Sequence, residues 1–370
     1  MKKILSKCTA FLFVFSTIPL ISCHDVIFDT VRDEVKLEEA QVSGDINSIV
    51  RFTKEDGKEY LFVDNGNIWY KDVTDAANGT PTTSGTFSGG WVPAFKTGIA
   101  ATHIIKLAAD SSHLYALGTK VEANSDSGDM EPTAKILYAS TDGDNWTAVT
   151  IGDSEILAVY YTADLFCTNS IKQANRHAFI NVAGTVYKLE AGTATAMETG
   201  TDDRTTTPMT TSHSCVYFEG NVYFSASVAF TTNETKDADA TIMYVNATGY
   251  VYYKTADSDW TTPVATNSIY AIAYTADYLI LGTSDGVTFV THENGIPTAT
   301  TVDTIANASS TLSSYYEVYN ILSVDPTKET LSGDLYGTTT FSGSTSSTGA
   351  TIDNVGLWAY YPGRGNWNRE

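Results

Sequence analysis

Two short apolar strands joined by an acidic or glycine-containing turn recur along this chain at a nearly constant spacing. The copies read SIVRFTKEDGKEYLFV, HIIKLAADSSHLYALGT, ILAVYYTADLFC, CVYFEGNVYFSA, YAIAYTADYLILGT and ILSVDPTKETLSGDLYG. The word Tyr-Thr-Ala-Asp stands unchanged at 161–164 and 274–277. Turn acids follow one another at intervals of 54, 54, 55 and 58 residues at Asp56, Asp110, Asp164, Glu219 and Asp277. A period of this length is typical of a fold built from stacked repeats.

Each repeat continues with a third and a fourth candidate strand. The third strands read NIWYKD, KILYAS, TVYKLE, YVYYKT, VTFVT and GLWAYY, and the fourth read GWVPAF, NWTAVT, TATAME, DWTTPV, TATTVD and NWNRE. Four short strands per repeat are typical of a β-propeller blade. A β-helix would have a much shorter period, and a β-sandwich would not repeat its turn words. We therefore predict an all-β fold, a β-propeller of about six four-stranded blades over 45–370, with a single-domain sandwich as the alternative.

The composition favours strands and argues against one class of partner. Aromatic residues make up 12% of the chain, and tyrosine alone occurs 22 times, a bias that suits β-structure. After residue 22 the chain carries 19 Lys and Arg against 43 Asp and Glu, a formal charge of −24. A phosphate-binding surface needs clustered cations, and the six arginines are scattered. We expect no nucleic-acid partner.

The N-terminal segment has the pattern of an export signal. Two lysines follow the initiating methionine, an apolar run extends from Thr9 to Ile21, and a small residue precedes Cys23. The run is shorter than the ~20 residues that span a bilayer, and it contains Pro19, so an uncleaved membrane helix is disfavoured. The segment resembles the signal of bacterial lipoproteins, in which the cysteine becomes the lipidated first residue.

That resemblance implies a signal peptide over 1–22 and a lipidated linker over 23–44, which includes the charged segment from Thr30 to Ala40. Acyl chains on Cys23, palmitate among them, would attach the protein to a membrane of the bacterial cell envelope, at the outer membrane or the periplasmic face. Membrane lipid is therefore the first expected partner. Cys167 and Cys215 remain in the exported chain, and they could form a disulfide or stay as two buried thiols.

A seven-residue motif suggests a specific relationship. The segment from Ser140 to Trp146 (STDGDNW) is similar to the Asp-box of sialidase-like propellers, with Asp142 accepting turn N–H groups, Gly143 allowing positive φ and the tryptophan filling space between strands. Weaker copies stand at 254–260 and 362–367. The whole chain also resembles uncharacterised spirochaetal lipoproteins of propeller type. These resemblances imply a structural role for the motif and name no activity.

Catalytic motifs point to no enzyme class. Sialidase-like enzymes need an arginine triad. The segment around Arg51 is the one most similar to the motif that contains their first arginine, but it lacks the other residues of that motif. The sequence has no Gly-x-Ser-x-Gly, P-loop, His-Glu-x-x-His or Cys-x-x-Cys, and the loop at 124–129 lacks the glutamate of a calcium-binding EF-hand. We expect no cofactor, no metal and no enzyme activity. Glycoside hydrolysis is the one class kept open, because it needs only two facing carboxylates.

Insertions mark one face of the predicted disc. Four stretches are read as lengthening the connection between the second and third strands of a blade, at 119–135, 168–177, 226–241 and 337–354. The third repeat carries a basic loop in an acidic chain, with a possible partner-binding set at Lys172, Arg176 and His177. The alternative is that Lys172 and Arg176 only compensate nearby acids.

These observations lead to one expected function and one alternative. We expect a lipid-anchored, non-enzymatic binding or scaffolding module whose partner is an unidentified envelope or host protein or a glycan. The alternative is a glycan-binding or glycan-hydrolysing sialidase-like propeller. Acids with a raised pKa and exposed aromatic rings at the central channel would favour the alternative, whereas a channel lined with Val, Ala, Ser and Thr would favour a scaffold.

Overall fold

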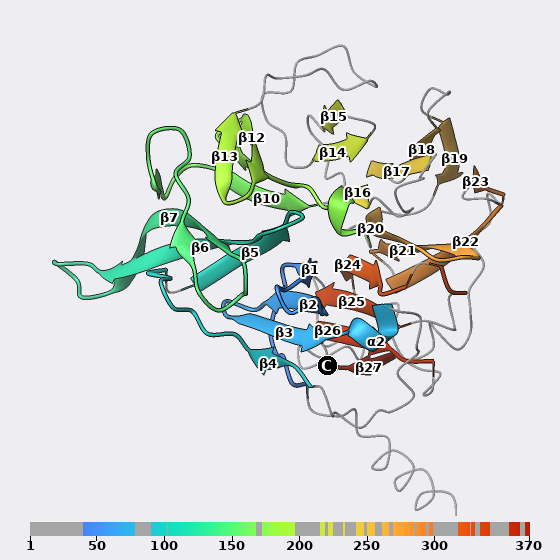
Figure 1. Ribbon diagram of the computed structural model, residues 1–370, viewed down its shortest axis with the longest axis horizontal. Helices are drawn as coiled ribbons and strands as arrows, with labels where there is room; N and C mark the ends of the chain where they lie inside the picture. The colour runs from blue at the N-terminus through green and yellow to red at the C-terminus, as the bar shows by residue number, and fades with distance from the viewer. Residues whose placement is uncertain are drawn as a thin grey trace, which may run out of the picture. The chain divides into compact units, whose positions relative to one another are not determined.

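Strands of two to eleven residues, rich in Val, Ile, Leu and Tyr, account for nearly all of the regular structure. In the computed structural model (Figure 1) the described residues are 40–370 without 78–89, 102, 168–171, 197–214, 219–220, 225–231, 234–241, 248–249, 256–260, 266–268, 285, 294–295, 299–316, 326, 330–333, 341–354 and 363–366. Side chains are not described over 215–268 or at residues 175 and 338–340. The predictions for the signal peptide, Cys23 and the linker up to residue 39 therefore lie outside the described residues.

Among the described residues, consecutive strands pair antiparallel in six sheets of four or five strands, which we number in chain order. Sheet 1 contains β1 (Ile49–Thr53), β2 (Glu59–Asp64), β3 (Ile68–Asp72) and β4 (Val92–Pro93). Sheet 2 contains β5 (His103–Ala109), β6 (Leu114–Ala123), β7 (Met130–Ser140) and β8 (Thr147–Ala148), and β9 (Ile156–Ala158) pairs with β7. Sheet 3 contains β10 (Ala163–Cys167), β11 (Ala178–Val182), β12 (Thr185–Glu190) and β13 (Thr193–Ala196).

The remaining sheets repeat the same order. Sheet 4 contains β16 (Thr232–Asn233), β17 (Ile242–Ala247), β18 (Tyr250–Thr255) and β19 (Thr261–Ala265), and sheet 5 contains β20 (Ile269–Tyr274), β21 (Tyr278–Thr283), β22 (Gly286–Glu293) and β23 (Ile296–Pro297). Sheet 6 contains β24 (Glu317–Ser323), β25 (Leu335–Thr340), β26 (Gly356–Tyr360) and β27 (Trp367–Arg369). A separate hairpin joins β14 (Cys215–Phe218) to β15 (Asn221–Phe224), and the helical pieces are α2 (Thr74–Ala77) and η1 (Gln173–Asn175). The predicted all-β fold is confirmed.

The strand assignment was wrong in the third repeat. Residues 156–158 form β9, an extra strand on the edge of sheet 2, and Asp164 lies inside β10 instead of in a turn. The partner of β10 is β11, which begins at Ala178. Residues 168–177 therefore connect the first and second strands of sheet 3. This places them at the other end of the strands from the second-to-third connections.

The fourth repeat also differs from the prediction. The words CVYF and NVYF form the β14–β15 hairpin, whereas sheet 4 takes β16 and β17 as its first two strands. The stretch 226–241 contains β16 and precedes the second strand of sheet 4, so it is not a second-to-third connection. The two other predicted insertions, 119–135 and 337–354, do lie at that step.

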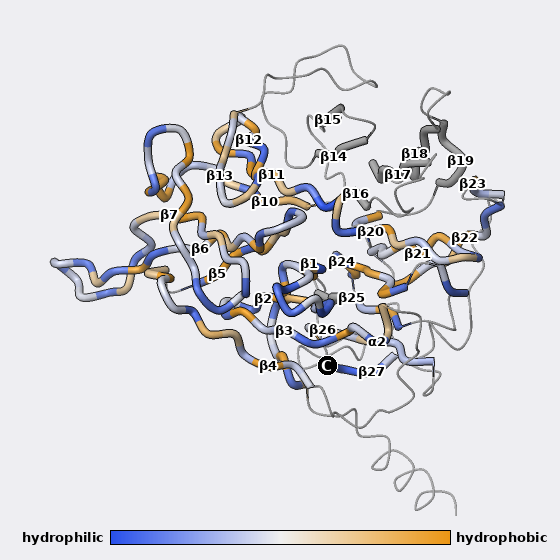
Figure 2. Tube along the Cα trace, viewed as in Figure 1, coloured by the Kyte–Doolittle hydropathy of each residue, from blue (hydrophilic) through white to orange (hydrophobic). Residues whose placement is uncertain are grey.

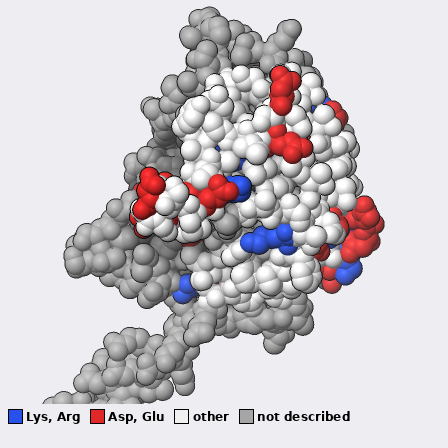
Figure 3. Space-filling model, turned by 90° about the vertical axis from the view of Figure 1, so that its left-hand side faces the viewer, with Lys and Arg blue, Asp and Glu red and all other residues white. Residues whose placement is uncertain are grey.

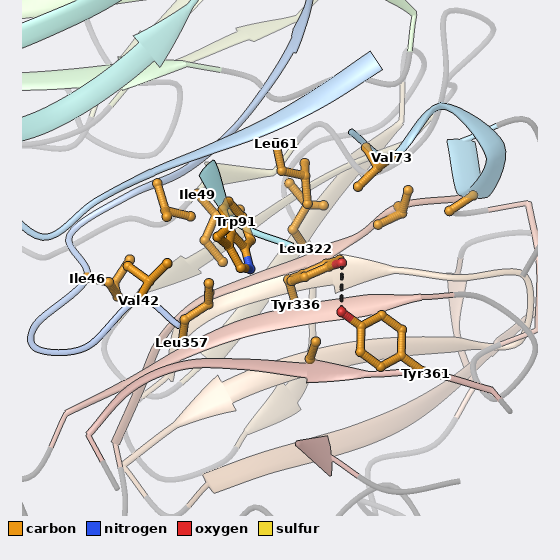
Figure 4. Close-up of a cluster of buried hydrophobic side chains, with 14 residues drawn as sticks. Val42, Ile46, Ile49, Leu61, Val73, Trp91, Leu322, Tyr336, Leu357 and Tyr361 are labelled. Atoms are coloured by element: carbon orange, nitrogen blue, oxygen red, sulfur yellow. Dashed lines mark hydrogen bonds between the residues drawn. The ribbon is translucent and has the colours of Figure 1, made fainter. Parts of the chain in front are cut away.

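Apolar side chains gather between neighbouring sheets. Figure 2 shows apolar stretches following the strands, with polar residues at many turns. One cluster joins sheets 1 and 2, a second joins sheets 2 and 3, and a third joins sheets 5 and 6. A further cluster joins sheet 6 back to sheet 1 through buried residues that include Leu61, Trp91, Tyr336 and Tyr361 (Figure 4). Among the sheets whose side chains are described, neighbouring sheets thus bury apolar side chains against each other, as stacked repeats require.

The sheet 2 hairpin extends well beyond its neighbours, because β6 and β7 continue pairing out to Ala123 and Met130. Its outer part exposes acids at Glu122, Asp126, Asp129 and Glu131. Figure 3 views the molecule from this side and shows acidic side chains in several groups. Exposed charge of one sign at the end of a hairpin opposes edge-to-edge association with another sheet.

Candidate functional site

Three of the strands that begin a sheet contain a β-bulge near their start. In β5 the register shifts between Ile104 and Lys106, in β20 between Ile269 and Ala271, and in β24 between Val318 and Asn320. The strands β1 and β10 keep a continuous register with their partners. A bulge inserts one residue and redirects its side chain, and bulges are enriched beside functional sites. The inserted residues are Ile105, Tyr270 and Tyr319.

Glycine in the second strand permits close packing beside two of these bulges. A Cβ atom on Gly282 would lie 2.5 Å from the carbonyl oxygen of Val318 in the next sheet, and one on Gly118 would lie 2.5 Å from the Cβ of Ala101. Both glycines stand in a repeated Leu-Gly-Thr word. This close approach lets β24 pack tightly on β21, which brings the bulges of β20 and β24 together.

The bulges of β20 and β24 bring two tyrosine rings into contact. Tyr270 and Tyr319 stack with ring centroids 4.3 Å apart and planes inclined by 14°. Tyr319 remains 40% exposed, and its hydroxyl donates a 2.7 Å hydrogen bond to Oε2 of Glu317. Burial, followed by the bond to Glu317, raises the pKa of Tyr319 above its ordinary value. The phenol is therefore a neutral hydrogen-bond donor over the physiological range.

Polar side chains continue this surface onto sheets 1 and 2. Asn320 donates through Nδ2 to the carbonyl oxygen of Asn47 at 3.4 Å, and Asn47 Nδ2 in turn donates to Oδ2 of Asp64 at 3.1 Å. The adjacent Ser48 hydroxyl accepts a 2.8 Å hydrogen bond from the backbone N–H of Leu107. The short segment before β1 therefore connects three sheets.

Asp64 is a buried acid behind this surface. It ends β2 with no exposed area, and burial raises its pKa to about 6 against the opposing effect of hydrogen bonds from Ser48 and Asn47 and of the charges on Lys106 and His103. Its Oδ1 atom has no hydrogen-bond partner among the described residues. Removing a carboxylate from water favours its neutral form, which explains the direction of the shift.

A solvent-accessible ion pair extends the surface to sheet 3. Lys106 Nζ lies 2.7 Å from Oδ1 of Asp164 and 4.8 Å from the centroid of the Phe166 ring. The exposed His103 begins β5 nearby. Five sheets thus contribute side chains near the starts of their first strands, and these strands are neighbours. We call this set of side chains the first-strand surface, formed by Asn47, His103, Lys106, Asp164, Tyr270, Glu317, Tyr319 and Asn320.

A second polar cluster is enclosed at the other end of β1. Arg51 donates through Nη2 to the carbonyl oxygens of Ser323 and Val324, each at 2.8 Å. Arg176 donates to Thr53 Oγ1 and to Glu59 Oε1, also at 2.8 Å each. Both arginines are only 2% exposed. Burial lowers the pKa of Arg51 to about 10 and lowers that of Arg176.

The enclosed position of Arg176 bears on the predicted partner-binding role of the basic loop. The Arg176 guanidinium compensates an internal carboxylate, and it does not face solvent where a partner could reach it. Lys172 is exposed, and His177 is half-buried with its pKa lowered by burial. A partner-binding role for Lys172 and His177 stays a prediction. Arg51 is likewise enclosed, so its guanidinium does not point to a substrate carboxylate.

Residues 140–146, whose sequence resembles an Asp-box, form a closed turn between β7 and β8. Asp142 Oδ1 accepts hydrogen bonds from the N–H groups of Asp144 and Asn145, both at 2.8 Å. The Ser140 hydroxyl accepts from the N–H of Gly143, whose φ is +80°. Trp146 is buried in the cluster between sheets 1 and 2. The hydrogen bonds close the turn locally, and the relationship to the Asp-box stays a prediction.

The other sequence predictions concern cysteines, metals and the membrane. Cys167 ends β10 half-buried, and the side chain of Cys215 lies outside the described residues, so their pairing stays a prediction. Within the described part of the chain, no group of three or more His, Cys, Asp or Glu side chains could hold a metal ion. No helix among the described residues has the length and apolar character needed to cross a membrane.

The residues that dominate the first-strand surface were not evident from the sequence. Tyr270, Tyr319 and Lys106 belong to strands that the sequence predicts, but strand patterns alone do not reveal a bulge. The repeated Leu-Gly-Thr word was the available signal, because glycine inside a strand often marks a bulge or a close approach of backbone.

No protein-family model matches the chain, and no curated protein matches it. Among solved structures it is similar to one from a structural and mechanistic analysis of two prolyl endopeptidases, with 12% identity and a TM-score of 0.34. The match covers 89% of this chain, which spans 42% of the length of that structure.

Proposed function

We propose that the protein is a lipid-anchored β-propeller of the bacterial cell envelope that binds a partner on its first-strand surface without chemically transforming it. The anchor is the lipoprotein-like signal ending at Cys23. In such a propeller the first-strand surface would lie at the ends of the blades nearest to the centre. Inserted residues and connections can vary there while the strands stay rigid.

The order and packing of the sheets support a propeller. Six sheets of consecutive strands follow one another, and the last contacts the first through β24 and β1. Arg51 of β1 bonds to the end of β24, and the backbone N–H of Val42 donates to the carbonyl oxygen of Glu370 at 3.0 Å. Packing of a last repeat onto the first is what a closed ring of blades requires.

The observation that supports binding most strongly is the stacked tyrosine pair at two neighbouring bulges, in which Tyr319 is exposed. Ligand sites combine aromatic surface with a few fixed polar groups, and the first-strand surface has both. Hydrolysis would need two carboxyl groups facing a bound substrate. Asp64 has the raised pKa of a general acid, but it is fully buried behind Asn47. This arrangement favours binding over hydrolysis.

Photo-crosslinking in living cells tests the binding site. A benzophenone amino acid replaces the exposed His103 on the first-strand surface, and a matched control replaces Tyr160, which is 79% exposed elsewhere on the protein. We expect a discrete adduct at position 103 and none at 160. Equal labelling at both positions, or none at 103, would contradict the proposed site.

The anchor has its own test. Cys23→Ala should abolish labelling by radioactive palmitate and should move the protein out of the membrane fraction. Cys167→Ala is the matched control, and it should retain both label and membrane association. Continued labelling of Cys23→Ala would show that the lipidated residue is not the one proposed.

A further inference from the structure

We propose that the open face of the Tyr319–Tyr270 stack, together with Glu317, binds one face of an uncharged pyranose ring. The ligand class would then be a neutral glycan. This inference rests on the proposed binding function and gives a chemical identity to the ligand of the same surface.

The stack is a preformed platform. Tyr270 covers one face of Tyr319, and the bond from the Tyr319 hydroxyl to Glu317 fixes the ring in its plane. Both tyrosines are the extra residue of a bulge, so the backbone of two sheets determines where the rings point. A ligand that lies on Tyr319 therefore does not need to order a mobile side chain, which removes one entropic cost of binding.

A sugar ring suits the geometry. The C–H groups on one face of a pyranose carry partial positive charge, and the face of an aromatic ring carries partial negative charge. Glu317 stands on the same strand two residues before the ring, and Asn320 follows directly after it. A carboxylate and an amide at the edge of the platform can accept and donate hydrogen bonds to the hydroxyl groups around a sugar.

Charge argues against an anionic ligand. Glu317 lies beside the platform. Arg51 in β1 and Arg176 are enclosed, and they are bonded to Glu59, Thr53 and backbone carbonyls. They are not available to pair with a ligand carboxylate such as that of sialic acid. A ligand without charge avoids repulsion from Glu317 and needs no buried counter-ion.

Elsewhere in the protein, three aromatic rings surround the ammonium group of Lys54. Lys54 Nζ lies 4.0 Å from the ring centroid of Tyr70, 4.8 Å from that of Tyr60 and 5.5 Å from that of Phe62. Three rings converge on that one ammonium group, as cation–π sites require. The parallel Tyr270–Tyr319 stack instead offers a single flat face, which suits the broad face of a ring.

Binding to immobilised oligosaccharides tests the inference. The full chain in detergent is applied to neutral hexose and N-acetylhexosamine oligomers and to sialylated and sulfated forms of the same oligomers. We expect saturable binding to at least one neutral oligomer and weaker binding to its anionic form. Tyr319→Ala should weaken the neutral interaction roughly tenfold or more, as loss of an aromatic anchor does. Tyr319→Phe keeps the ring and should retain binding within about threefold.

Tyr160→Ala is the control, because it removes a tyrosine that is even more exposed, 79% against 40% for Tyr319, from another place on the protein. Binding that is absent for all neutral oligomers, or unchanged by Tyr319→Ala, would overturn the glycan inference. If position 103 still crosslinks to a protein in cells, the proposed binding function would stand without it. If position 103 gives no adduct as well, both would fail.

Discussion

Lys71 Nζ lies 2.6 Å from Oε2 of Glu370, which joins the third strand of sheet 1 to the end of sheet 6 across 299 residues of sequence. The two side chains are 12% and 1% exposed. The indole of Trp91 and the hydroxyl of Tyr361 donate to the same carboxylate. The first and last sheets therefore share a hydrogen-bonded charge pair whose carboxylate is buried and whose ammonium group is partly buried.

Glu370→Gln should destabilise the protein by about 3 kcal/mol, because it leaves the Lys71 ammonium without its counter-charge in a buried site. The measurement is the free energy of unfolding in urea. Glu190→Gln is the control, since that carboxylate is 70% exposed and pairs with Lys188 at the surface. Its effect should stay below about 1 kcal/mol. Equal losses in both variants would contradict the assigned role of Glu370.

Arg176→Met should cost about 3 kcal/mol of unfolding free energy, because Glu59 would keep a largely buried charge without its closest cation. Lys172→Met, four residues earlier and exposed, should change stability by less than about 0.5 kcal/mol. In a double-mutant cycle, Glu59→Gln should recover part of the loss in Arg176→Met. Strictly additive effects of the two substitutions would show that the pair is not coupled.

Asp142 should make stability fall in acid. Although partial burial by itself raises its pKa, hydrogen bonds from Asn145 and Asp144 lower it to about 2, below the ordinary value of 3.8. Its contribution is therefore complete above pH 4 and is lost as the pH falls toward 2. Asp142→Asn should be less stable than the parent protein by about 1 kcal/mol at pH 7. This free energy is small because solvent screens a carboxylate that is only partly buried.

The deficit of Asp142→Asn should shrink between pH 4 and pH 2, and chemical unfolding at each pH measures it. Thr141→Ala, at the exposed neighbouring position, should follow the parent protein throughout. A deficit that does not change with pH would mean that the charge of Asp142 does not contribute to the turn.

Asp64 should have the opposite effect to Asp142 on the pH dependence of stability. Its pKa is raised from 3.8 to about 6, so the folded protein holds this proton more tightly than the unfolded chain. The stability it contributes is present below pH 4 and is lost as the pH rises through 6. Asp64→Asn mimics the neutral acid, and relative to the parent protein it should gain about 2 to 3 kcal/mol between pH 4 and pH 7. A difference that stays constant with pH would contradict this.

Short-range patterns in the sequence predicted structure well where hydrogen bonds are local. The turn from Ser140 to Trp146 is held by bonds between residues two or three positions apart, so its geometry follows from the motif. The third strands of the repeats were also placed correctly, from NIWYKD in β3 to GLWAYY in β26. Alternating apolar residues and flanking turns determine such strands.

Patterns that depend on distant partners were not predictable in the same way. The word Tyr-Thr-Ala-Asp ends β20 and enters its turn at 274–277, whereas at 161–164 the same word leads into β10. Identical residues take different positions because the strand that pairs with them fixes the register. Arg176 illustrates the same limit, since its partner Glu59 stands 117 residues earlier in the chain.

The contact between the first and last sheets also dictates an order of events during synthesis. The N–H of Val42 pairs with the carbonyl of Glu370, and Arg51 bonds to the backbone at 323 and 324. An emerging chain can form the middle sheets from local pairs, but the apolar flank of sheet 1 has no cover until about 300 further residues have left the ribosome. During that time, newly made protein exposes an apolar surface on sheet 1 that is prone to aggregation. Assistance from a chaperone matters most during that interval.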